Sequence, residues 1–403
     1  MLAAAGSLPL ASLATDAAGT VPDSTELPFK SGFAVTDVTY LDSGSTHPIS
    51  LGSYARLQAY LGGRMLDPNA PEYHHDDSSV LARYAELVNA DVDEVTFVQS
   101  TTTGEQMVLR SLGFPETGGH IVTDTLHFFA SLPLYAEMER QGMEVTWIRD
   151  RDGRILLDDV RKAVRPGTKL VALSLISTIN GFEHDLKAVC DIAHEAGALV
   201  YADIIHAVGC TPVDLHASGV DFAAGSSYKW LMGDFGLGFL YVRKEVQSQL
   251  KRTNYGYYGM SEFRSHVYPF DPPGDSIVDY AFRDDATGLF ALGTRASSVI
   301  ALLQYSLDYI LKVGVKNIQA HAQTMIERLH EELPERGFNV MTPRESGSPM
   351  IACAYENARE VLAARLREAK VRITVSRNRF RISVSVFNDM NDIDRLLVVL
   401  GRA

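Results

Sequence analysis

Short apolar runs alternate with segments of helical periodicity from residue 79 to residue 242. Such runs are typical of strands that helices cover on both faces, as in a parallel sheet. The pattern therefore predicts an α/β domain with a mostly parallel sheet. Its strands are expected at 94–99, 120–123, 144–148, 170–175, 198–203, 222–224 and 238–242, and its helices at 79–89, from 100 onward, and at 129–141, 157–163 and 185–195.

The periodicity changes after residue 244. Residues 254–274 are rich in Tyr, Gly and Pro and are predicted to form a loop. Because 403 residues are more than one core usually accommodates, we expect a large domain over 38–290 and a small α+β domain over 291–403. In the second domain, helices are expected at 296–313, 317–332, 358–369 and 390–401, and strands at 350–354, 371–375 and 381–386.

The first 37 residues form a separate N-terminal arm in this division. Residues 1–19 are small and apolar but lack the basic segment of a secretory signal, so they predict either the end of an export signal or a disordered arm. Residues 20–38 are polar and rich in turn formers, and are expected to be a linker. The sequence leaves the location open between the cytoplasm and, if a signal is present, the periplasm.

Composition narrows the class of protein. Hydrophobic residues make up 46% and charged residues 22%, as in ordinary soluble enzymes. The net charge of −13 argues against nucleic acid or an anionic membrane as the main partner, and no apolar run is long enough to span a bilayer. Three cysteines imply no disulfide framework, and Cys190 and Cys353 are interpreted as buried, inert thiols within predicted elements.

A polar loop at 62–77 ends in His74, His75, Asp76 and Asp77. These residue types can bind metals, but neighbours in sequence point in different directions and no partner motif follows at ligand spacing. A solvated or substrate-facing loop is the favoured interpretation, and no metal is expected.

Hydroxyl residues follow the predicted strand 94–99 and begin a helix in the stretch Ser100-Thr-Thr-Thr-Gly104. Free N–H groups and the positive end of the helix dipole would meet these hydroxyls, which is the chemistry of an anion site. A plain helix cap is the alternative. The three threonines and the glycine favour the anion site.

Lys229 lies in a glycine-rich turn with apolar flanks, 26 residues after Asp203 at the end of a predicted strand. Taken alone, Lys229 is best interpreted as a surface lysine. An apolar setting would instead lower its pKa and make it a nucleophile. A lysine, a carboxylate and a hydroxyl-lined helix terminus are together what a pyridoxal 5′-phosphate site needs: an imine-forming amine, a partner for the pyridine nitrogen and donors for the phosphate.

The chain resembles the class V aminotransferase family of fold type I pyridoxal-phosphate enzymes over about residues 38–400. This group includes cysteine desulfurases, selenocysteine lyase, kynureninase and isopenicillin-N epimerase. The resemblance rests on Tyr40-Leu-Asp-Ser-Gly, Phe97-Val-Gln-Ser-Thr-Thr-Thr-Gly, Tyr201-Ala-Asp-Ile-Ile-His, Ser226-Ser-Tyr-Lys-Trp-Leu, Phe290-Ala-Leu-Gly-Thr and Arg381-Ile-Ser-Val-Ser-Val-Phe-Asn.

The resemblance implies roles for residues at the matching positions. Lys229 would form the Schiff base with the cofactor and move the proton at the substrate Cα. Asp203 would pair with the pyridine nitrogen, and His206 would bond the phenolic oxygen of the ring. The residues that would hold the phosphate are Thr101, Thr102, Ser226 and Tyr228, the last standing where many relatives carry histidine.

Further positions carry over to the substrate and to a second subunit. Arg381 would clamp the α-carboxylate of a small amino-acid-like substrate. Thr294 matches a threonine that relatives reach from the partner subunit, which implies a homodimer with shared active sites. Phe128 stands where desulfurases stack a histidine on the ring. Thr178 stands where relatives often have asparagine, and either Thr178 or Asn180 could approach the phenolic oxygen.

The sequence indicates the cofactor more clearly than it indicates the reaction. Desulfurases carry a nucleophilic cysteine in a loop that is here 376–380 and contains none, so cysteine desulfurase activity is disfavoured. The leading hypothesis is chemistry at Cα or Cβ of an amino acid or modified peptide, by transamination, epimerisation or elimination. A C–S or C–Se lyase without its own cysteine is second. A dinucleotide-binding α/β protein is remote, because Gly-x-Gly-x-x-Gly is missing.

The sequence features that bear on the size of the substrate are less specific than those that indicate the cofactor. The aromatic loop 255–258 and the arginines Arg372, Arg377 and Arg379 suggest a substrate larger than alanine with a second anionic group. Solvated loop arginines are the equally weighted alternative.

Overall fold

The computed structural model describes residues 19–67, 69–73 and 77–403. The apolar stretch that predicts a signal remnant or arm lies outside the described residues up to residue 18. His74, His75 and Asp76 of the polar loop also lie outside them.

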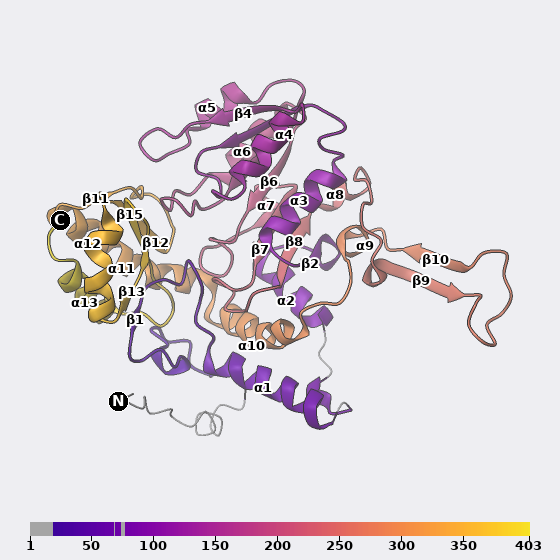
Figure 1. The fold of residues 1–403 in the computed structure, drawn as a ribbon, viewed down its shortest axis with the longest axis horizontal. Helices are drawn as coiled ribbons and strands as arrows, with labels where there is room; N and C mark the ends of the chain where they lie inside the picture. Colours follow the sequence, from indigo (N-terminus) through magenta and orange to yellow (C-terminus); the bar gives the residue numbers. More distant parts are fainter. Residues whose placement is uncertain (1–18, 68, 74–76) are drawn as a thin grey trace.

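A seven-stranded sheet forms the centre of the molecule (Figure 1). Its order is β2-β8-β7-β6-β5-β3-β4; β8 runs antiparallel to both of its neighbours, and the other six strands share one direction. The predicted α/β domain with a mostly parallel sheet is confirmed. The strands are β2 (Val95–Val98), β3 (His120–Asp124), β4 (Glu144–Ile148), β5 (Thr168–Ser174), β6 (Leu199–Asp203), β7 (Phe222–Ser226) and β8 (Gly238–Val242).

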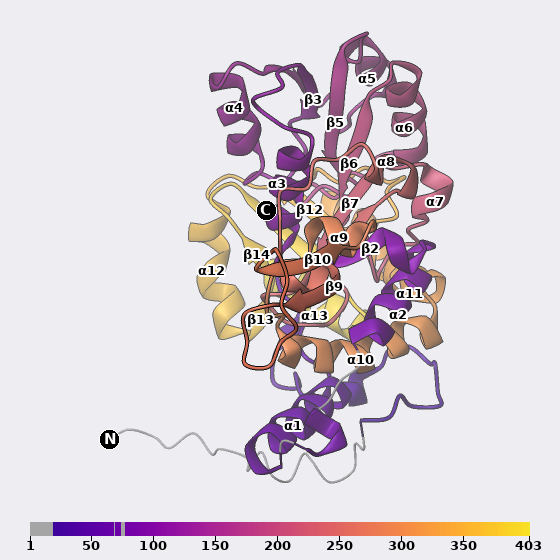
Figure 2. The same cartoon turned by 90° about the vertical axis from the view of Figure 1, so that its right-hand side faces the viewer.

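Helices cover both faces of this sheet. Figure 2 shows α4 and α6 on opposite sides of the strands β3 and β5. Every residue of β2, β3, β7 and β8 is buried, which explains why these strands are apolar without alternation. The helices are α2 (Asp77–Val88), α3 (Thr101–Ser111), α4 (Leu132–Arg140), α5 (Leu157–Ala163), α6 (Leu186–Glu195), α7 (Leu215–Ser218) and α8 (Lys244–Gln247).

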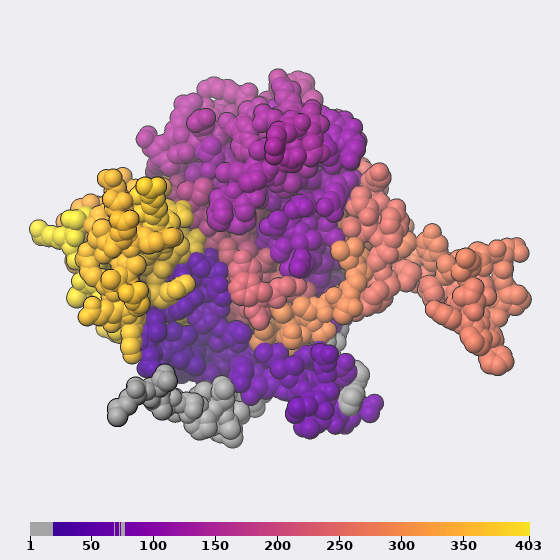
Figure 3. Space-filling view, viewed as in Figure 1, coloured from indigo at the N-terminus to yellow at the C-terminus, as the bar shows by residue number. Residues whose placement is uncertain are grey.

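A second, smaller core lies at the C-terminal end of the chain, yellow in Figures 1 and 3. Its antiparallel sheet has the order β11-β12-β15-β14. Most buried apolar residues of α10 pack into the large core, as does Ile318 near the start of α11, whereas the buried apolar residues of α11 from Ala322 onward join the small core. A domain boundary at residue 290 stays a prediction, and this packing favours one nearer Gly314. The elements are α10 (Ser297–Val313), α11 (Val315–Glu335), β11 (Asn339–Val340), β12 (Met350–Ala354), α12 (Ala358–Glu368), β13 (Val371–Arg372), β14 (Thr374–Val375), β15 (Arg379–Ser383) and α13 (Met390–Leu400).

The segment before the large domain is packed rather than free. Phe33 is buried against His47 and Phe387, and the backbone N–H of Phe29 donates to the carbonyl of Val386. The prediction of a linker over 20–38 is therefore wrong for this part: the chain is irregular but fastened to the body by aromatic contacts. The strand β1 (Thr39–Tyr40) then pairs with β13, and the helix α1 (Leu51–Leu66) follows it.

A hairpin replaces part of the loop predicted at 254–274. The strands β9 (Met260–Ser265) and β10 (Val278–Phe282) pair antiparallel and project from the body, as Figures 1 and 3 show. Most residues of both strands are exposed or half-buried. The two strands therefore lack the buried apolar runs that mark the strands of the large sheet, which is why the hairpin is missed. The short helix α9 (Ala286–Phe290) follows it.

Within the described residues, no single helix has the length and hydropathy of a membrane span; α10 and α11 pass such a test only as a pair bent by 78°.

Candidate active site

The carboxyl edge of the large sheet gathers the residues that the sequence singles out. Thr101 follows β2, Phe128 follows β3, Thr178 follows β5, Asp203 ends β6 and Lys229 follows β7. These strands all run in one direction, so their carboxyl ends meet at one edge, where open α/β sheets bind ligands. The five positions therefore lie along one edge of the sheet.

Lys229 and His206 form the centre of this edge. The Lys229 Nζ lies 3.0 Å from the His206 Nε2, and both side chains are buried, with Lys229 only 7% exposed. Burial, helped by the positive charge of Arg381, lowers the pKa of Lys229 to about 7. Burial and the charges of Lys229 and Arg381 also hold the pKa of His206 well below its ordinary value. Near pH 7 the pair therefore offers a neutral imidazole beside an amine that is neutral in about half of the molecules.

A glycine allows this close approach. Gly209 has a φ of +93°, and a Cβ at this position would lie 2.6 Å from the carbonyl oxygen of Trp230. The turn after His206 can thus pack directly on the turn after Lys229, because residue 209 carries no side chain. Any larger residue would push His206 and Lys229 apart.

Asp203 lies beside this pair and is 3% exposed. Its Oδ1 accepts a hydrogen bond from the N–H of Ile205 at 3.0 Å, and its Oδ2 lies 3.5 Å from the Ser174 hydroxyl. Burial raises the pKa of Asp203, while the positive charges of His127 and Lys229 act in the opposite direction. The carboxylate thus has unused acceptor capacity in a buried place, as a partner of a protonated ring nitrogen requires.

The N-terminus of α3 lies close to the end of β7. Thr101 and Ser226 bond reciprocally: each backbone N–H donates to the other hydroxyl, at 2.8 and 3.0 Å, and the hydroxyls are 3.0 Å apart. A Cβ at Gly104 would lie 3.0 Å from that of Ala224, so glycine lets the helix pack closely on the strand.

Ser100 satisfies the cap of α3 by accepting a hydrogen bond from the N–H of Thr103 at 3.2 Å. Ser100 therefore serves as the plain helix cap, and neither Thr101 nor Thr102 is needed for that role. Among the described residues, the half-buried Thr102 side chain has no hydrogen-bond partner. The helix terminus thus presents the donors of an anion site.

Tyr228 is half-buried, and its ring stacks on that of Phe235 with centroids 4.4 Å apart. Among the described residues, the Tyr228 hydroxyl makes no hydrogen bond to Thr101 or to Ser226. The ring also lies beside the Lys229 amine, which is 5.7 Å from its centroid.

Arg381 reaches the same edge from β15 of the small domain and is 4% exposed. One terminal nitrogen donates to the Thr178 hydroxyl at 2.7 Å, and the other donates to Ser45 and Thr374 at 3.0 and 3.2 Å. Its Nε is buried without a partner among the described residues. Burial lowers the pKa of Arg381 to about 10, so the guanidinium remains charged near pH 7 and can bind a carboxylate.

The contacts separate the two candidates for the phenolic oxygen. Asn180 is occupied structurally: its amide donates to the Gly153 carbonyl at 2.7 Å and its oxygen accepts from the N–H of Phe182 at 3.0 Å. The Thr178 hydroxyl bonds Arg381. The structure therefore links Thr178 to Arg381, whereas the Asn180 side chain bonds backbone groups of Gly153 and Phe182.

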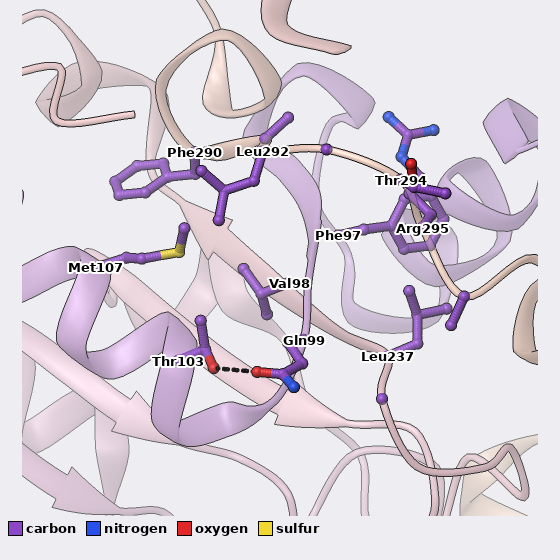
Figure 4. Close-up of a pocket in the computed structure, with 14 residues that line it drawn as sticks. Phe97, Val98, Gln99, Thr103, Met107, Leu237, Phe290, Leu292, Thr294 and Arg295 are labelled. Carbon is purple, nitrogen blue, oxygen red and sulfur yellow. Dashed lines mark hydrogen bonds between the residues drawn. The ribbon is translucent and has the colours of Figure 1, made fainter. Parts of the chain in front are cut away.

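Phe128 is anchored beside the site by its backbone, whereas Thr294 lies exposed in a separate pocket. The half-buried Phe128 is held through its backbone N–H, which donates to Ser174 at 3.1 Å, and its ring contacts Phe129. Thr294 is exposed, and it lines a pocket of about 510 Å³ with Phe97 and Arg295 (Figure 4). Thr294 has no bond to the described residues around Lys229 of its own chain.

Two of the three loop arginines form an ion pair or hydrogen bonds within the protein itself. Arg372 pairs with Asp42 at 3.1 Å, and Arg379 donates to the carbonyl groups of Thr178 and Ile179. Arg377 is exposed. These contacts favour the solvated or structural alternative for Arg372 and Arg379 over a second anion site.

Sequence reasoning missed the residues behind the site. Glu105 and His127 form a buried pair, and Ser174 connects His127 with Asp203. Asp42 and Thr374 support Arg381 from the far ends of the chain. The one signal in the sequence was the presence of the ionisable residues Glu105 and His127 next to apolar segments, because charged residues are rarely buried there without a partner.

The cysteines are buried, although the Cys210 Sγ lies 3.4 Å from the backbone carbonyl oxygen of His206. Cys190, Cys210 and Cys353 are all buried, and burial raises the pKa of Cys353 to about 12. Cys353 lies on β12 opposite Phe380 of β15. The interpretation of Cys190 and Cys353 as buried thiols is confirmed, and no cysteine of the chain can act as an exposed nucleophile.

Comparisons with known proteins give a consistent result. The family model for aminotransferase class V matches residues 71–396. A probable cysteine desulfurase of Methanothermobacter thermautotrophicus is 27% identical over 305 residues, covering 73% of this chain and 72% of the relative. Kynureninase of Pseudomonas fluorescens is 25% identical over 338 residues, covering 79% and 77%.

Two solved structures share the fold. The cysteine desulfurase CsdA from Escherichia coli has a TM-score of 0.77 at 20% identity, covering 92% of this chain and 96% of its own. The cystine C–S lyase C-DES, in complex with cysteine persulfide, has a TM-score of 0.80 at 16% identity, covering 92% and 99%.

Proposed function

Because the chain belongs to the aminotransferase class V family, whose members work with pyridoxal 5′-phosphate, we propose that Lys229 binds this cofactor and moves a proton at Cα of an amino acid. The observation that carries the proposal is the buried Lys229 amine, 3.0 Å from His206 at the edge where Asp203 ends its strand.

The side chains present fit the cofactor. His206 keeps a buried Nδ1 without a partner among the described residues, and Asp203 has spare acceptor capacity. The N-terminus of α3, with Thr101, Thr102 and Ser226, supplies neutral donors for a phosphate. Each polar group of the cofactor thus has a partner of suitable chemistry.

Bound pyridoxal phosphate supplies a ring that accepts the electrons of a bond broken at the substrate Cα. The protein's own residues supply the rest. With its pKa lowered to about 7, Lys229 can take up and return the Cα proton near neutral pH. Arg381 would hold the substrate carboxylate and so fix the orientation of the bonds at Cα. The negative charge of Asp203 favours a protonated ring nitrogen.

This arrangement supports transamination, epimerisation or elimination at Cα or Cβ as the reaction class. A second candidate is a C–S or C–Se lyase that releases sulfur or selenium without a protein-bound persulfide. The three buried cysteines favour it over a desulfurase mechanism that uses an enzyme thiol. The likeness to proteins named as desulfurases and as a cystine C–S lyase supports sulfur chemistry.

We also infer that the active form is a homodimer with shared sites. Thr294 is exposed in its pocket, where a group from a second copy can reach it. The hairpin β9–β10 leads away from this region and carries exposed apolar side chains, and a two-stranded hairpin is marginal in water by itself. The exposed set is Phe263, Val267, Tyr268, Phe270, Ile277 and Tyr280.

The test of the reaction is direct. The loaded protein is incubated with single amino acids, including cysteine and cystine, in deuterium oxide. Cα deuterium exchange, keto-acid release and sulfide release are then measured separately. Exchange at Cα with any amino acid supports the proposal. Absence of all three with every amino acid, in protein that holds the cofactor, contradicts it.

A further inference from the structure

A buried polar network lies behind Asp203 and joins three elements of the large domain. The His127 Nδ1 is 2.8 Å from the Ser174 hydroxyl, which lies 3.5 Å from the Asp203 Oδ2. On its other side, the His127 Nε2 is 3.1 Å from the Glu105 Oε1. Glu105, His127, Ser174 and Asp203 are each at most 3% exposed. The four side chains form a continuous path from α3 to the end of β6.

Hydrogen bonds and opposite charges favour the ion pair of Glu105 and His127. The Glu105 Oε2 accepts from the Ser131 hydroxyl at 2.6 Å, and its Oε1 accepts from the Tyr135 hydroxyl at 2.6 Å, which stabilises the carboxylate form. Burial alone would raise the pKa of Glu105 and lower that of His127, but the hydrogen bond and the opposite charges of the pair outweigh it, so the pKa of Glu105 is lowered and that of His127 is raised. In this charge state both ring nitrogens of His127 carry hydrogens, and the Nε2–H donates to Glu105.

The Ser174 hydroxyl has two possible directions, and His127 decides between them. Its oxygen already accepts from the N–H of Phe128 at 3.1 Å. If His127 is doubly protonated, its Nδ1–H donates to Ser174, and the Ser174 hydrogen is free to donate to Asp203. If His127 is neutral with its hydrogen on Nε2, Ser174 donates to the bare Nδ1, and Asp203 loses that donor.

We propose that Glu105 and His127 are positioning residues that act through Ser174 to keep Asp203 ionised in its buried site. The negative charge of Glu105 keeps His127 protonated, and protonated His127 turns the Ser174 hydroxyl toward Asp203. An ionised Asp203 then leaves the proton on the ring nitrogen of the cofactor. This inference rests on the proposed role of Asp203 toward that nitrogen.

The charges around His127 agree with this state. The groups that face it are Glu105 from α3, Asp124 from β3, Asp203 from β6 and the Tyr135 hydroxyl from α4. Three are carboxyl groups, and the fourth is a hydroxyl whose hydrogen is already donated to Glu105. Every facing charge thus favours the imidazolium form.

The experiment uses the apoprotein and two ligands, pyridoxal phosphate and its analogue with a CH group in place of the ring nitrogen. Affinities are measured for the native protein, Glu105→Gln, Ser174→Ala and Asp203→Asn. Glu105→Gln and Ser174→Ala should each weaken pyridoxal phosphate about tenfold, the scale of one hydrogen bond to a charged group, and leave the analogue unchanged. An equal loss for both ligands would mean a merely structural role and would overturn the proposal, as would no loss.

Asp221→Asn serves as the matched control. Asp221 is a buried carboxylate that pairs with His194 at 2.9 Å next to the start of β7, at the opposite edge of the sheet. Its replacement should lower stability and should not discriminate between the two ligands. Asp203→Asn separates the proposed role of Asp203 from the proposed relay. If Asp203→Asn does not discriminate between the two ligands, the role of Asp203 toward the ring nitrogen fails. If Asp203→Asn discriminates but Glu105→Gln and Ser174→Ala do not, only the relay fails.

Nitrogen-15 NMR of the apoprotein gives a second readout without any cofactor. Both ring nitrogens of His127 should be protonated at pH 7 in the native protein. Glu105→Gln should leave one of them unprotonated. A neutral His127 in the native protein would contradict the relay even if a variant fails to fold.

Discussion

The Lys229 Nζ lies 3.0 Å from the His206 Nε2, and neither side chain reaches solvent appreciably. A lysine in this position cannot keep its ordinary pKa, because burial disfavours the ammonium ion and no carboxylate among the described residues bonds the amine directly. The pairing explains how a surface-type residue becomes the reactive group of the site. It also makes the chemistry of Lys229 measurable through its pH dependence.

The reaction of the apoprotein with pyridoxal phosphate should depend on pH through Lys229. The neutral amine is the nucleophile, and its pKa lies at about 7 instead of 10.5. The rate of formation of the visible absorption band should therefore rise as the pH passes through about 7 and level off above it. A rate that keeps rising towards pH 10 would mean that Lys229 titrates as a solvated lysine.

Replacement of Lys229 by alanine should lower turnover about 10²–10⁴-fold, the usual contribution of a positioned acid–base group. The matched control is Lys244→Ala, since Lys244 is exposed and paired with Asp93 at 2.6 Å on the surface. Steady-state kinetics of both variants check the prediction. Undiminished turnover in Lys229→Ala would remove this lysine from the mechanism.

Arg381→Gln should act on the substrate and leave the cofactor in place. Loss of a buried guanidinium that clamps a carboxylate should raise KM for the amino acid about 30-fold or more. The affinity for pyridoxal phosphate should change little, because Arg381 bonds Thr178, Ser45 and Thr374. Arg377→Ala, at an exposed arginine in the turn just before β15, is the control and should leave KM unchanged.

Thiol reagents should leave activity intact. Cys190, Cys210 and Cys353 are buried, and their pKa values are raised by burial, so thiolate is scarce at neutral pH. The measurement is residual activity after prolonged iodoacetamide treatment under native conditions. Rapid inactivation that substrate prevents would show a cysteine at work in the site.

The molecular mass in solution should be twice the 44.2 kDa of the chain. Tyr268→Ser and Phe270→Ser at the exposed end of the hairpin should shift the equilibrium towards monomer by analytical ultracentrifugation. Mixed dimers of Lys229→Ala and Thr294→Ala subunits should regain activity, since one of the two sites then holds both native residues. A fully active monomer would exclude shared sites.

The sequence predicts the parts of the site that lie at strand ends. Asp203 and Lys229 follow apolar runs, and a run buried on both faces is visible without any knowledge of contacts. The hairpin is not predictable this way, because its strands bury neither face. The bond between Arg381 and Thr178 spans 203 residues and exists only because two domains meet. Glu105 and His127 likewise meet only after α3 has packed on the sheet.

Chemical trapping of the bond between Lys229 and the cofactor would identify the reactive lysine without any knowledge of the substrate. The pyridoxal-phosphate-loaded protein is reduced with borohydride, digested, and the modified peptide is identified by mass spectrometry. We predict one pyridoxyl group per chain, on Lys229. Modification of a different lysine, or loaded protein in which no lysine is modified, would contradict it.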